Sequence, residues 1–292
     1  MSTKNSLRAM LFIPGTSEKM FEKIPSLSPG AFILDLEDSV PPREKDRARR
    51  LVGDFLRETG DRFELHVRIN SMTSPYLDAD LASVVTGNLS GIIVPKVEHP
   101  DDLRILNGRI DSIASELGQN LDHIGLTATI ETTTGVRSVY DIAKVGGHLR
   151  RLSFGSGDFA LDLGLDWPDE EGVPEIMLLA KSELVLASRA AGMEQPHDGA
   201  YTNFRDPEGL AREARQSRRL GFAGKHVIHP MQIAIVNEIF QPSPRQIERA
   251  QRLVAAFKLA EESGTGAIGI DGELVDYAII KRARRLLEEL DE

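Results

Sequence analysis

Short apolar runs, four to eight residues long, recur along this chain and are separated by longer amphipathic segments. Most of the runs are unbroken rather than alternating, which is typical of parallel strands covered on both faces. We expect strands at residues 10–13, 31–36, 64–69, 91–94, 123–130, 151–154, 199–202 and 225–228. Segments such as 43–59, 100–117, 174–191 and 207–220 have the apolar spacing of amphipathic helices.

This repeated alternation of strand and helix predicts an α/β protein with a closed (β/α)8 barrel, the TIM-barrel architecture. The length of 292 residues suits that fold, because such a barrel takes roughly 250 residues. A doubly wound open sheet is the alternative, since hydrophobic periodicity does not report closure. The strand at 199–202 has the weakest apolar signal of the set.

The pattern changes after residue 240. Ser243, Pro244 and Gln246 form the signature of a helix start, with a capping hydroxyl, a proline in the first turn and a reciprocal amide. This helix is expected to run to about Glu262 and to stop at Gly264.

A glycine-rich extended piece at 264–276 follows, with a turn signal at Asp271-Gly272, and a last helix is expected at 278–290. We therefore expect a catalytic barrel at 1–240 and a helix–loop–helix appendage at 241–292. The appendage is expected to cover the barrel mouth as a lid or to dock on a neighbouring subunit.

The composition excludes several classes of protein. The chain has no cysteine, which excludes disulfides, thiolate zinc sites and a cysteine nucleophile. Its formal net charge of −10 argues against broad binding to nucleic acid or to a membrane surface. The first eight residues are polar, and no apolar run reaches 18 residues, so we expect no signal peptide and no membrane span. These features favour a cytoplasmic protein.

Polar side chains follow nearly every predicted strand, where a barrel of this kind carries its catalytic groups. Pro14 and Gly15 follow the first strand, and the polar residues after later strands are Asp35, Glu37 and Asp38; Arg68 and Asn70; Lys96; Glu131; Asp158; and His229. A buried belt of ion pairs explains the three acids after the second strand as well as catalysis does, and both interpretations stay open.

Glu131 and Asp158 each closely follow an apolar run on neighbouring strands, which lie about 4.8 Å apart in a sheet. Two carboxylates so placed can share one hard cation, and Mg²⁺ suits a site with few protein ligands; plain polar strand ends are the alternative. Arg68 lies late in its strand, where burial of its charge costs free energy unless the guanidinium is paired or has a function. It can grip a carboxylate or stabilise an oxyanion, or it can pair with Asp35 and Glu37.

With these residues in place, the chain resembles the HpcH/HpaI aldolase and citrate lyase β-subunit superfamily. Collinear motifs carry the resemblance over residues 8 to about 288, at 8–15, 33–40, 67–70, 94–98, 130–135, 154–158, 224–230 and 272–276. Segments 23–27 and 203–206 are most similar to the stand-alone citrate-lyase-β-like branch, which includes citramalyl-CoA and malyl-CoA lyases.

The resemblance implies a (β/α)8 barrel, a Mg²⁺ ion, an acyl-CoA substrate and reversible carbon–carbon cleavage. It implies metal binding by Glu131 and Asp158, substrate binding by Arg68, and a homo-oligomer, trimer or hexamer. Asp276 matches a late aspartate that in relatives often reaches the active site of an adjacent subunit. Thr133 departs from the family pattern beside the metal site and bears on the acyl pocket.

The implied reaction cleaves a 3-hydroxy-3-carboxyl acyl-CoA, such as (S)-citramalyl-CoA or malyl-CoA, to acetyl-CoA and pyruvate or glyoxylate. Arg68 is expected to stabilise charge at the thioester oxygen or to hold the carboxylate, and Asp276 to protonate the enolate carbon. Glu37 and Asp38, with Asp35, are expected to orient Arg68 and metal-bound water.

The other substrate contacts are expected from Pro14, Gly15, Asp35 and Lys19, and the CoA phosphates are expected at Lys19, Lys23 and Arg43. A citrate lyase β subunit and a malyl-CoA thioesterase or malate-synthase-like enzyme are the alternatives with related chemistry. A non-catalytic binding barrel is disfavoured by the charged strand ends. The interpretation as a dinucleotide-binding oxidoreductase depends on the glycine pattern at 155–160 alone and is the last of the alternatives.

Overall fold

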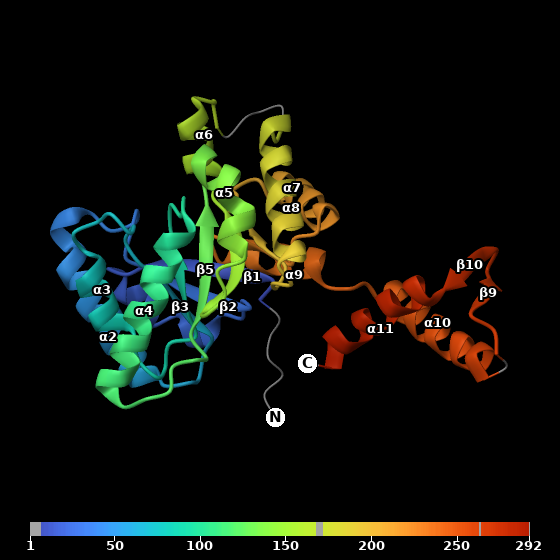
Figure 1. Cartoon of the computed structure of the whole chain (residues 1–292). Coiled ribbons are helices and arrows are strands. Elements are labelled where there is room, and N and C mark those ends of the chain that lie inside the picture. The colour runs from blue at the N-terminus through green and yellow to red at the C-terminus, as the bar shows by residue number, and fades with distance from the viewer. Residues whose placement is uncertain (1–6, 168–171, 263, 292) are drawn as a thin grey trace. The chain divides into compact units, whose positions relative to one another are not determined.

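The computed structural model describes residues 7–167, 172–262 and 264–291. The chain divides into two compact units, Leu7–Phe240 and the segment from Gln241 onward. In the first unit eight parallel strands close into a barrel in sequence order, and the last pairs with the first (Figure 1). The predicted (β/α)8 barrel is confirmed, and the open sheet is excluded.

The barrel strands and the helices around them follow the predicted alternation. The strands are β1 (Ala9–Pro14), β2 (Ala31–Asp35), β3 (Leu65–Arg68), β4 (Gly91–Val94), β5 (Gly125–Ile130), β6 (Leu149–Phe154), β7 (His197–Asp198) and β8 (Gly224–Val227). The helices are α1 (Glu18–Phe21), α2 (Lys45–Thr59), α3 (Leu77–Val84), α4 (Pro100–Leu117), α5 (Thr133–Ala143), α6 (Ser156–Leu163), α7 (Glu175–Ala190), α8 (Pro207–Leu220) and α9 (Met231–Phe240). Within the described ranges, no helix combines the length and apolar character needed to cross a membrane.

The predicted position of the seventh barrel strand is wrong. It was predicted at 199–202, but β7 is only two residues long, His197 and Asp198. Both side chains are polar and fully buried, so no apolar run marks the strand. Gly199 follows at a tight approach to β6, where a Cβ atom would lie 2.6 Å from the carbonyl oxygen of Phe154.

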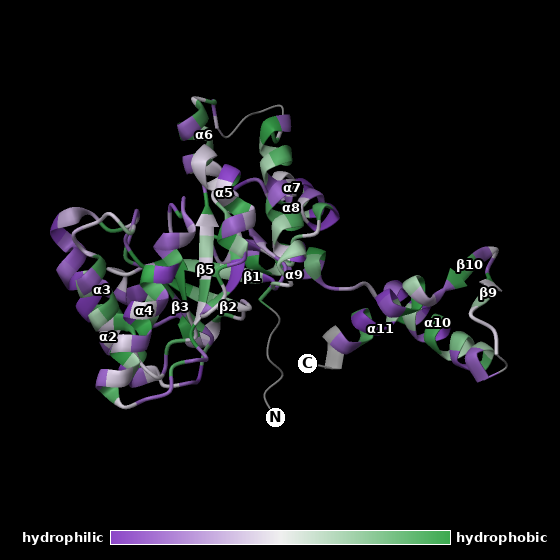
Figure 2. Ribbon diagram, in the orientation of Figure 1, coloured by the Kyte–Doolittle hydropathy of each residue, from purple (hydrophilic) through white to green (hydrophobic). Residues whose placement is uncertain are grey.

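The main apolar core fills the layer between the strands and the surrounding helices, as the hydropathy colouring of Figure 2 shows. Residues of β1 and β2 that face this layer, such as Leu11 and Leu34, are fully buried. A smaller cluster contains Met10 and Ile33, which alternate with them along the strands and so face the barrel interior.

Histidines share that interior with the apolar cluster. Lys225 of β8 bonds to Glu213 on α8, so the next residue, His226, faces the opposite way, into the barrel. Its ring makes edge-to-face contacts with Phe12, at 5.4 Å between centroids, and with His197, at 5.9 Å. Burial lowers the pKa of His226 to about 3, so the imidazole is neutral at physiological pH.

Acid is therefore expected to destabilise the barrel through His226. Below pH 6.5 the unfolded chain takes up a proton that the folded barrel excludes, so the free energy of unfolding falls by up to about 1.4 kcal/mol per pH unit. Replacing His226 with Leu should reduce the loss between pH 7 and pH 5 by about 2 kcal/mol, measured by denaturant unfolding. Exposed His123 provides the matched control. An identical loss in wild type and His226→Leu would contradict this assignment.

The second unit contains α10 (Pro244–Glu262), β9 (Ala267–Ile270), β10 (Glu273–Asp276) and α11 (Tyr277–Asp291). The predicted capping box is present. The backbone N–H of Gln246 donates to the Ser243 hydroxyl, and the backbone N–H of Ser243 donates to Gln246 Oε1. The expected loop between the two helices is in fact an antiparallel hairpin. Asp271 and Gly272 both have positive φ, which suits the tight two-residue turn of a hairpin.

Candidate active site

Asp35 and Arg68 form the innermost ion pair at the carboxyl ends of the strands. They are the last residues of β2 and β3 and are register partners. Arg68 donates to both Asp35 oxygens, from Nε at 2.6 Å and from Nη2 at 2.7 Å, and its guanidinium lies 4.8 Å from the Phe12 ring. Burial opposes ionisation of Asp35, but Arg68 and the Ser39 hydroxyl hold its pKa below the ordinary value. The expected ion-pair belt is confirmed here.

The remaining guanidinium nitrogen of Arg68 faces outward, toward Glu37 and Asp38. Nη1 lies 3.2 Å from Glu37 Oε2 and 3.4 Å from Asp38 Oδ2. The Asp38 side chain is 57% exposed, whereas that of Asp35 is 2% exposed. Since Asp35 occupies Nε and Nη2, Nη1 is the part of Arg68 that an incoming substrate can reach.

Lys96 links these acids to the next two strand ends. It follows β4, and its Nζ lies 2.8 Å from Glu37 Oε1 and 3.7 Å from Asp158 Oδ1. Its backbone N–H donates to Glu131 Oε1 at 2.8 Å. The sequence places Lys96 at a strand end but gives no reason to expect it between the acids. The left-handed φ of 51°, which turns the backbone toward Glu131, leaves no mark in the sequence.

Glu131 and Asp158 come from the ends of β5 and β6. Glu131 is almost fully buried, whereas Asp158, in the first turn of α6, is 33% exposed at its side chain. Gly155 gives Glu131 its space, because a Cβ atom there would lie 2.1 Å from Glu131 Oε2. The structure thus brings both predicted metal ligands around Lys96.

Burial and then the negative charges of Asp158 and Glu37 raise the pKa of Glu131 to about 8. A cation bound beside this carboxylate would favour its charged form and lower its pKa again. In the described part of the chain, no set of three or more histidine and acidic side chains is arranged to hold a metal. Two carboxylates with open positions for water or substrate match the requirements of Mg²⁺ better than those of Zn²⁺, so the site fits the expected metal.

Gly155→Ala is expected to disturb the site by forcing Glu131 out of place. Overpacking of this kind costs about 1–3 kcal/mol, so the free energy of unfolding and the affinity for Mg²⁺ should both fall. Gly157, two residues along, has nothing within 4 Å of an added Cβ and provides the matched control. Urea unfolding and titration calorimetry of Gly155→Ala and Gly157→Ala measure the difference, and equal behaviour of the two variants would contradict it.

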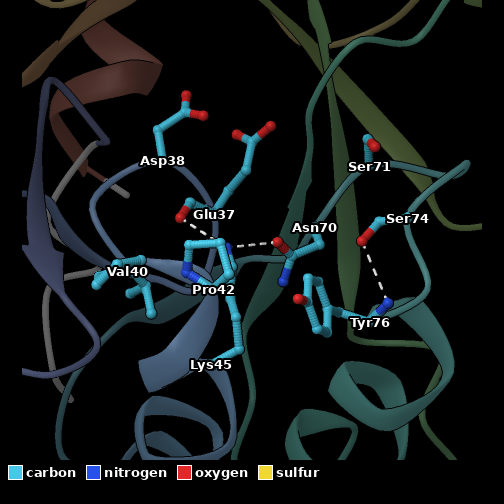
Figure 3. A pocket seen from close by; sticks show the side chains of 10 residues that line it. Glu37, Asp38, Val40, Pro42, Lys45, Asn70, Ser71, Ser74 and Tyr76 are labelled. Carbon is cyan, nitrogen blue, oxygen red and sulfur yellow. Dashed lines mark hydrogen bonds between the residues drawn. The ribbon is translucent and has the colours of Figure 1, made fainter.

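A pocket of about 350 Å³ opens beside these acids (Figure 3). Glu37 and Asp38 direct their carboxylates away from the ammonium group of Lys45, which lies beside the backbone carbonyl of Glu37. Lys45 Nζ donates three hydrogen bonds, to the carbonyls of Leu36 and Glu37 and to Asn70 Oδ1. Its ammonium is therefore saturated, and the loop that carries Glu37 is fastened to β3.

The other predicted substrate contacts differ in position. Gly15 packs tightly on β2, with its N–H 2.8 Å from the carbonyl oxygen of Asp35, and Pro14 ends β1 beside it. Lys19 and Lys23 are exposed on and after α1, and Arg43 is exposed before α2. These basic residues are accessible to an anion, and their role stays a prediction.

Two further predicted residues have structural partners. The Thr133 hydroxyl and N–H both donate to Asp162 at 2.7 Å, so Thr133 ties α5 to α6. Asp276 caps α11, accepting from the N–H groups of Ala278 at 3.0 Å and Ile279 at 3.1 Å. Because Asp276 belongs to the second unit, its proposed place in an active site stays a prediction.

Comparison with known proteins identifies the family. The family model described as HpcH/HpaI aldolase/citrate lyase matches residues 8–230. Citrate lyase subunit beta of Leuconostoc mesenteroides subsp. cremoris is 32% identical over 291 residues, covering 99% of this chain and 94% of that protein. Mitochondrial citramalyl-CoA lyase of Rattus norvegicus is 33% identical and covers 96% and 85%. A (3S)-malyl-CoA thioesterase of Cereibacter sphaeroides is 36% identical and covers 97% and 94%.

A solved structure agrees with this grouping. Protein CitE from Mycobacterium tuberculosis, in complex with magnesium, acetoacetate and coenzyme A, superimposes with a TM-score of 0.77 at 25% identity. The match covers 99% of this chain and 100% of that one. The barrel, its strand-end acids and these similarities show that this chain is an enzyme of the HpcH/HpaI aldolase/citrate lyase family.

Proposed function

We propose that the chain is a Mg²⁺-dependent carbon–carbon lyase acting on a 3-hydroxy-3-carboxyl acyl-CoA. The substrate would be (S)-citramalyl-CoA or malyl-CoA, and the products acetyl-CoA and pyruvate or glyoxylate. The observation that carries the proposal is the convergence of Glu131 and Asp158 on Lys96 at the carboxyl ends of the strands. The acyl-CoA enzymes among the relatives, and the magnesium and coenzyme A in the CitE complex, support it.

Glu131 and Asp158 would hold the Mg²⁺ ion. When bound, Mg²⁺ supplies Lewis-acid polarisation of substrate oxygens and lowers the pKa of a coordinated hydroxyl. Glu131 is positioned for this by the Lys96 backbone N–H and by the space at Gly155. Asp158 stands at the more open side of the pair, where water and substrate can enter.

Arg68 would stabilise the charge that develops when the carbon–carbon bond breaks. The hydroxyl proton passes to water, the hydroxyl oxygen becomes the carbonyl oxygen of the 2-oxo acid, and the electron pair of the broken carbon–carbon bond passes into the acetyl thioester as an enolate, which then takes up one proton at carbon. Asp35 fixes the guanidinium from behind through two hydrogen bonds, so Nη1 faces the reactants already oriented. A preorganised donor of this kind acts without reorganisation during the reaction.

Asp276 would deliver a proton to the enolate carbon from an adjacent subunit of a trimer or hexamer. Replacing Asp276 with Ala is expected to reduce kcat by about 10²-fold or more and to leave Mg²⁺ and CoA-ester affinity unchanged. Turnover and equilibrium binding are measured on the same preparation, to check that kcat falls while the affinities for Mg²⁺ and the CoA ester stay the same. An unchanged kcat would leave Asp276 only its role as the cap of α11, and loss of helix content on circular dichroism would identify a structural effect.

A cleavage panel tests the proposal directly. Purified enzyme is incubated with (S)-citramalyl-CoA, malyl-CoA, citryl-CoA and an acyl-carrier-bound citryl group, with Mg²⁺ or with chelator, and pyruvate, glyoxylate, oxaloacetate and free CoA are measured. Release of a 2-oxo acid from a free CoA ester in the presence of Mg²⁺, but not in the presence of chelator, supports the lyase. Oxaloacetate from an acyl-carrier-bound citryl group, without activity on free CoA esters, supports a citrate lyase β subunit instead. Free CoA with an intact hydroxy acid supports a thioesterase, as in the Cereibacter relative.

A further inference from the structure

Among the residues that the structure describes, Lys96 contacts every acid of the site except Asp35, and the proposed reaction gives its side chain no role. Its ammonium lies 2.8 Å from Glu37 Oε1, 3.7 Å from Asp158 Oδ1 and 3.9 Å from Asp38 Oδ1. Its backbone N–H bonds to Glu131 at 2.8 Å. Both proposed metal ligands therefore touch the same residue.

The backbone of Lys96 explains how one residue reaches both sides. Its φ of 51° lies in the left-handed region, which residues with a side chain rarely adopt unless their surroundings hold them there. In this conformation the N–H group points to Glu131 while the side chain extends to Glu37 and Asp158. The strained backbone is thus part of the construction of the site.

The local charges leave Lys96 as the main counter-charge. Arg68 commits two of its three nitrogens to Asp35, so among the described residues Glu37, Asp38 and Asp158 lie beside one guanidinium edge and one ammonium. The Lys96 side chain is 35% exposed, so the ammonium can move outward when another cation arrives. A cation bound by Asp158 would repel it at short range.

We propose that Lys96 is a positioning residue that acts as the internal counter-cation of the acid cluster and competes with a divalent cation for Asp158. The proposal rests on the proposed metal site. In the metal-free enzyme the ammonium holds Asp158 and Glu37 together. On metal binding it gives up the longer contact to Asp158 and keeps the shorter one to Glu37. Lys96 thereby weakens metal affinity, so that bound metal can exchange.

Calorimetric titration of the full chain with MgCl₂ tests the competition. Lys96→Met is expected to bind Mg²⁺ about ten-fold more tightly than wild type, because the repulsion is removed. Lys96→Arg keeps the charge and should stay close to wild type. Lys96→Gly keeps the N–H and relieves the φ, so it should behave as Lys96→Met if the ammonium is the cause.

The control is Lys144→Met, which removes the same charge from an exposed lysine at the far end of α5. It should leave affinity unchanged. Equal or weaker Mg²⁺ binding by Lys96→Met and Lys96→Gly would overturn the proposal and leave the lyase assignment intact. If the wild-type chain itself did not bind Mg²⁺, the proposed metal site would be wrong.

A metal-free measurement decides the counter-cation role in either case. Urea unfolding in chelator is compared for wild type, Lys96→Met, Glu37→Gln and the double variant. Lys96→Met should lower the unfolding midpoint in the wild-type background and lower it less in the Glu37→Gln background, where the ammonium has lost its closest charged partner and keeps only its longer contacts to Asp38 and Asp158. Additive effects would overturn the proposal.

Discussion

Glu131→Gln is expected to abolish Mg²⁺-dependent cleavage, with kcat/KM falling about 10³-fold or more. The amide keeps the shape of the side chain and can still accept the Lys96 N–H at Oε1. It lacks the negative charge that a hard cation requires. Release of the 2-oxo acid at saturating Mg²⁺, with Mg²⁺ affinity from calorimetry, measures both consequences.

Asp158→Asn should have the same effect, because we propose that the two carboxylates hold the same cation. Asp141→Asn provides the matched control, since Asp141 is exposed on α5 and only pairs with Lys144 at 3.7 Å. Full activity of either metal-ligand variant after chelation would remove the metal from the mechanism. Full metal affinity with lost turnover would move the ligand role to other residues.

Asp198→Asn is expected to produce the largest loss of stability, about 3–5 kcal/mol. Asp198 of β7 is fully buried and receives Lys181 at 2.9 Å and Lys225 at 2.7 Å, with the Ser217 hydroxyl at 2.6 Å. Burial opposes its charge, but the two ammonium groups hold the pKa of Asp198 well below its ordinary value. Removing that charge leaves two buried lysines with Glu213 alone.

Urea unfolding at neutral pH measures this loss. Asp101→Asn removes one side of an exposed pair with Arg104, in which the Asp101 side chain is 77% exposed, and should change the free energy of unfolding by about 0.5 kcal/mol or less. A loss below about 1 kcal/mol for Asp198→Asn would mean that apolar packing, rather than these ion pairs, holds β7 in the barrel.

The barrel could be predicted because most strands are continuous apolar runs, buried on both faces. The 91–94 strand and the 100–117 helix match β4 and α4 in full. β7 could not be predicted, because Asp198 is buried by lysines from α7 and β8 rather than by apolar neighbours. Partners so far apart in the sequence leave no local pattern.

The candidate site likewise contains features that local sequence predicts and features that it does not. Glu131, Asp158 and Arg68 could be selected as candidates because each is a charged residue at the end of a strand or within four residues after it. The place of Lys96 among them depends on a left-handed backbone angle, and that of Glu131 on the missing Cβ of Gly155. Both are three-dimensional properties that residue type alone does not report.

The hairpin of the second unit governs where Asp276 can point. Asp276 is the last residue of β10, and its pairing with Ala267 is set by the two-residue turn at Asp271-Gly272. Side chains alternate along a strand, so one extra residue in that turn would send the carboxylate to the opposite side of the ribbon. Two loop residues thus determine the direction of the carboxylate that we propose as a proton donor, although its own sequence neighbourhood would be unaltered.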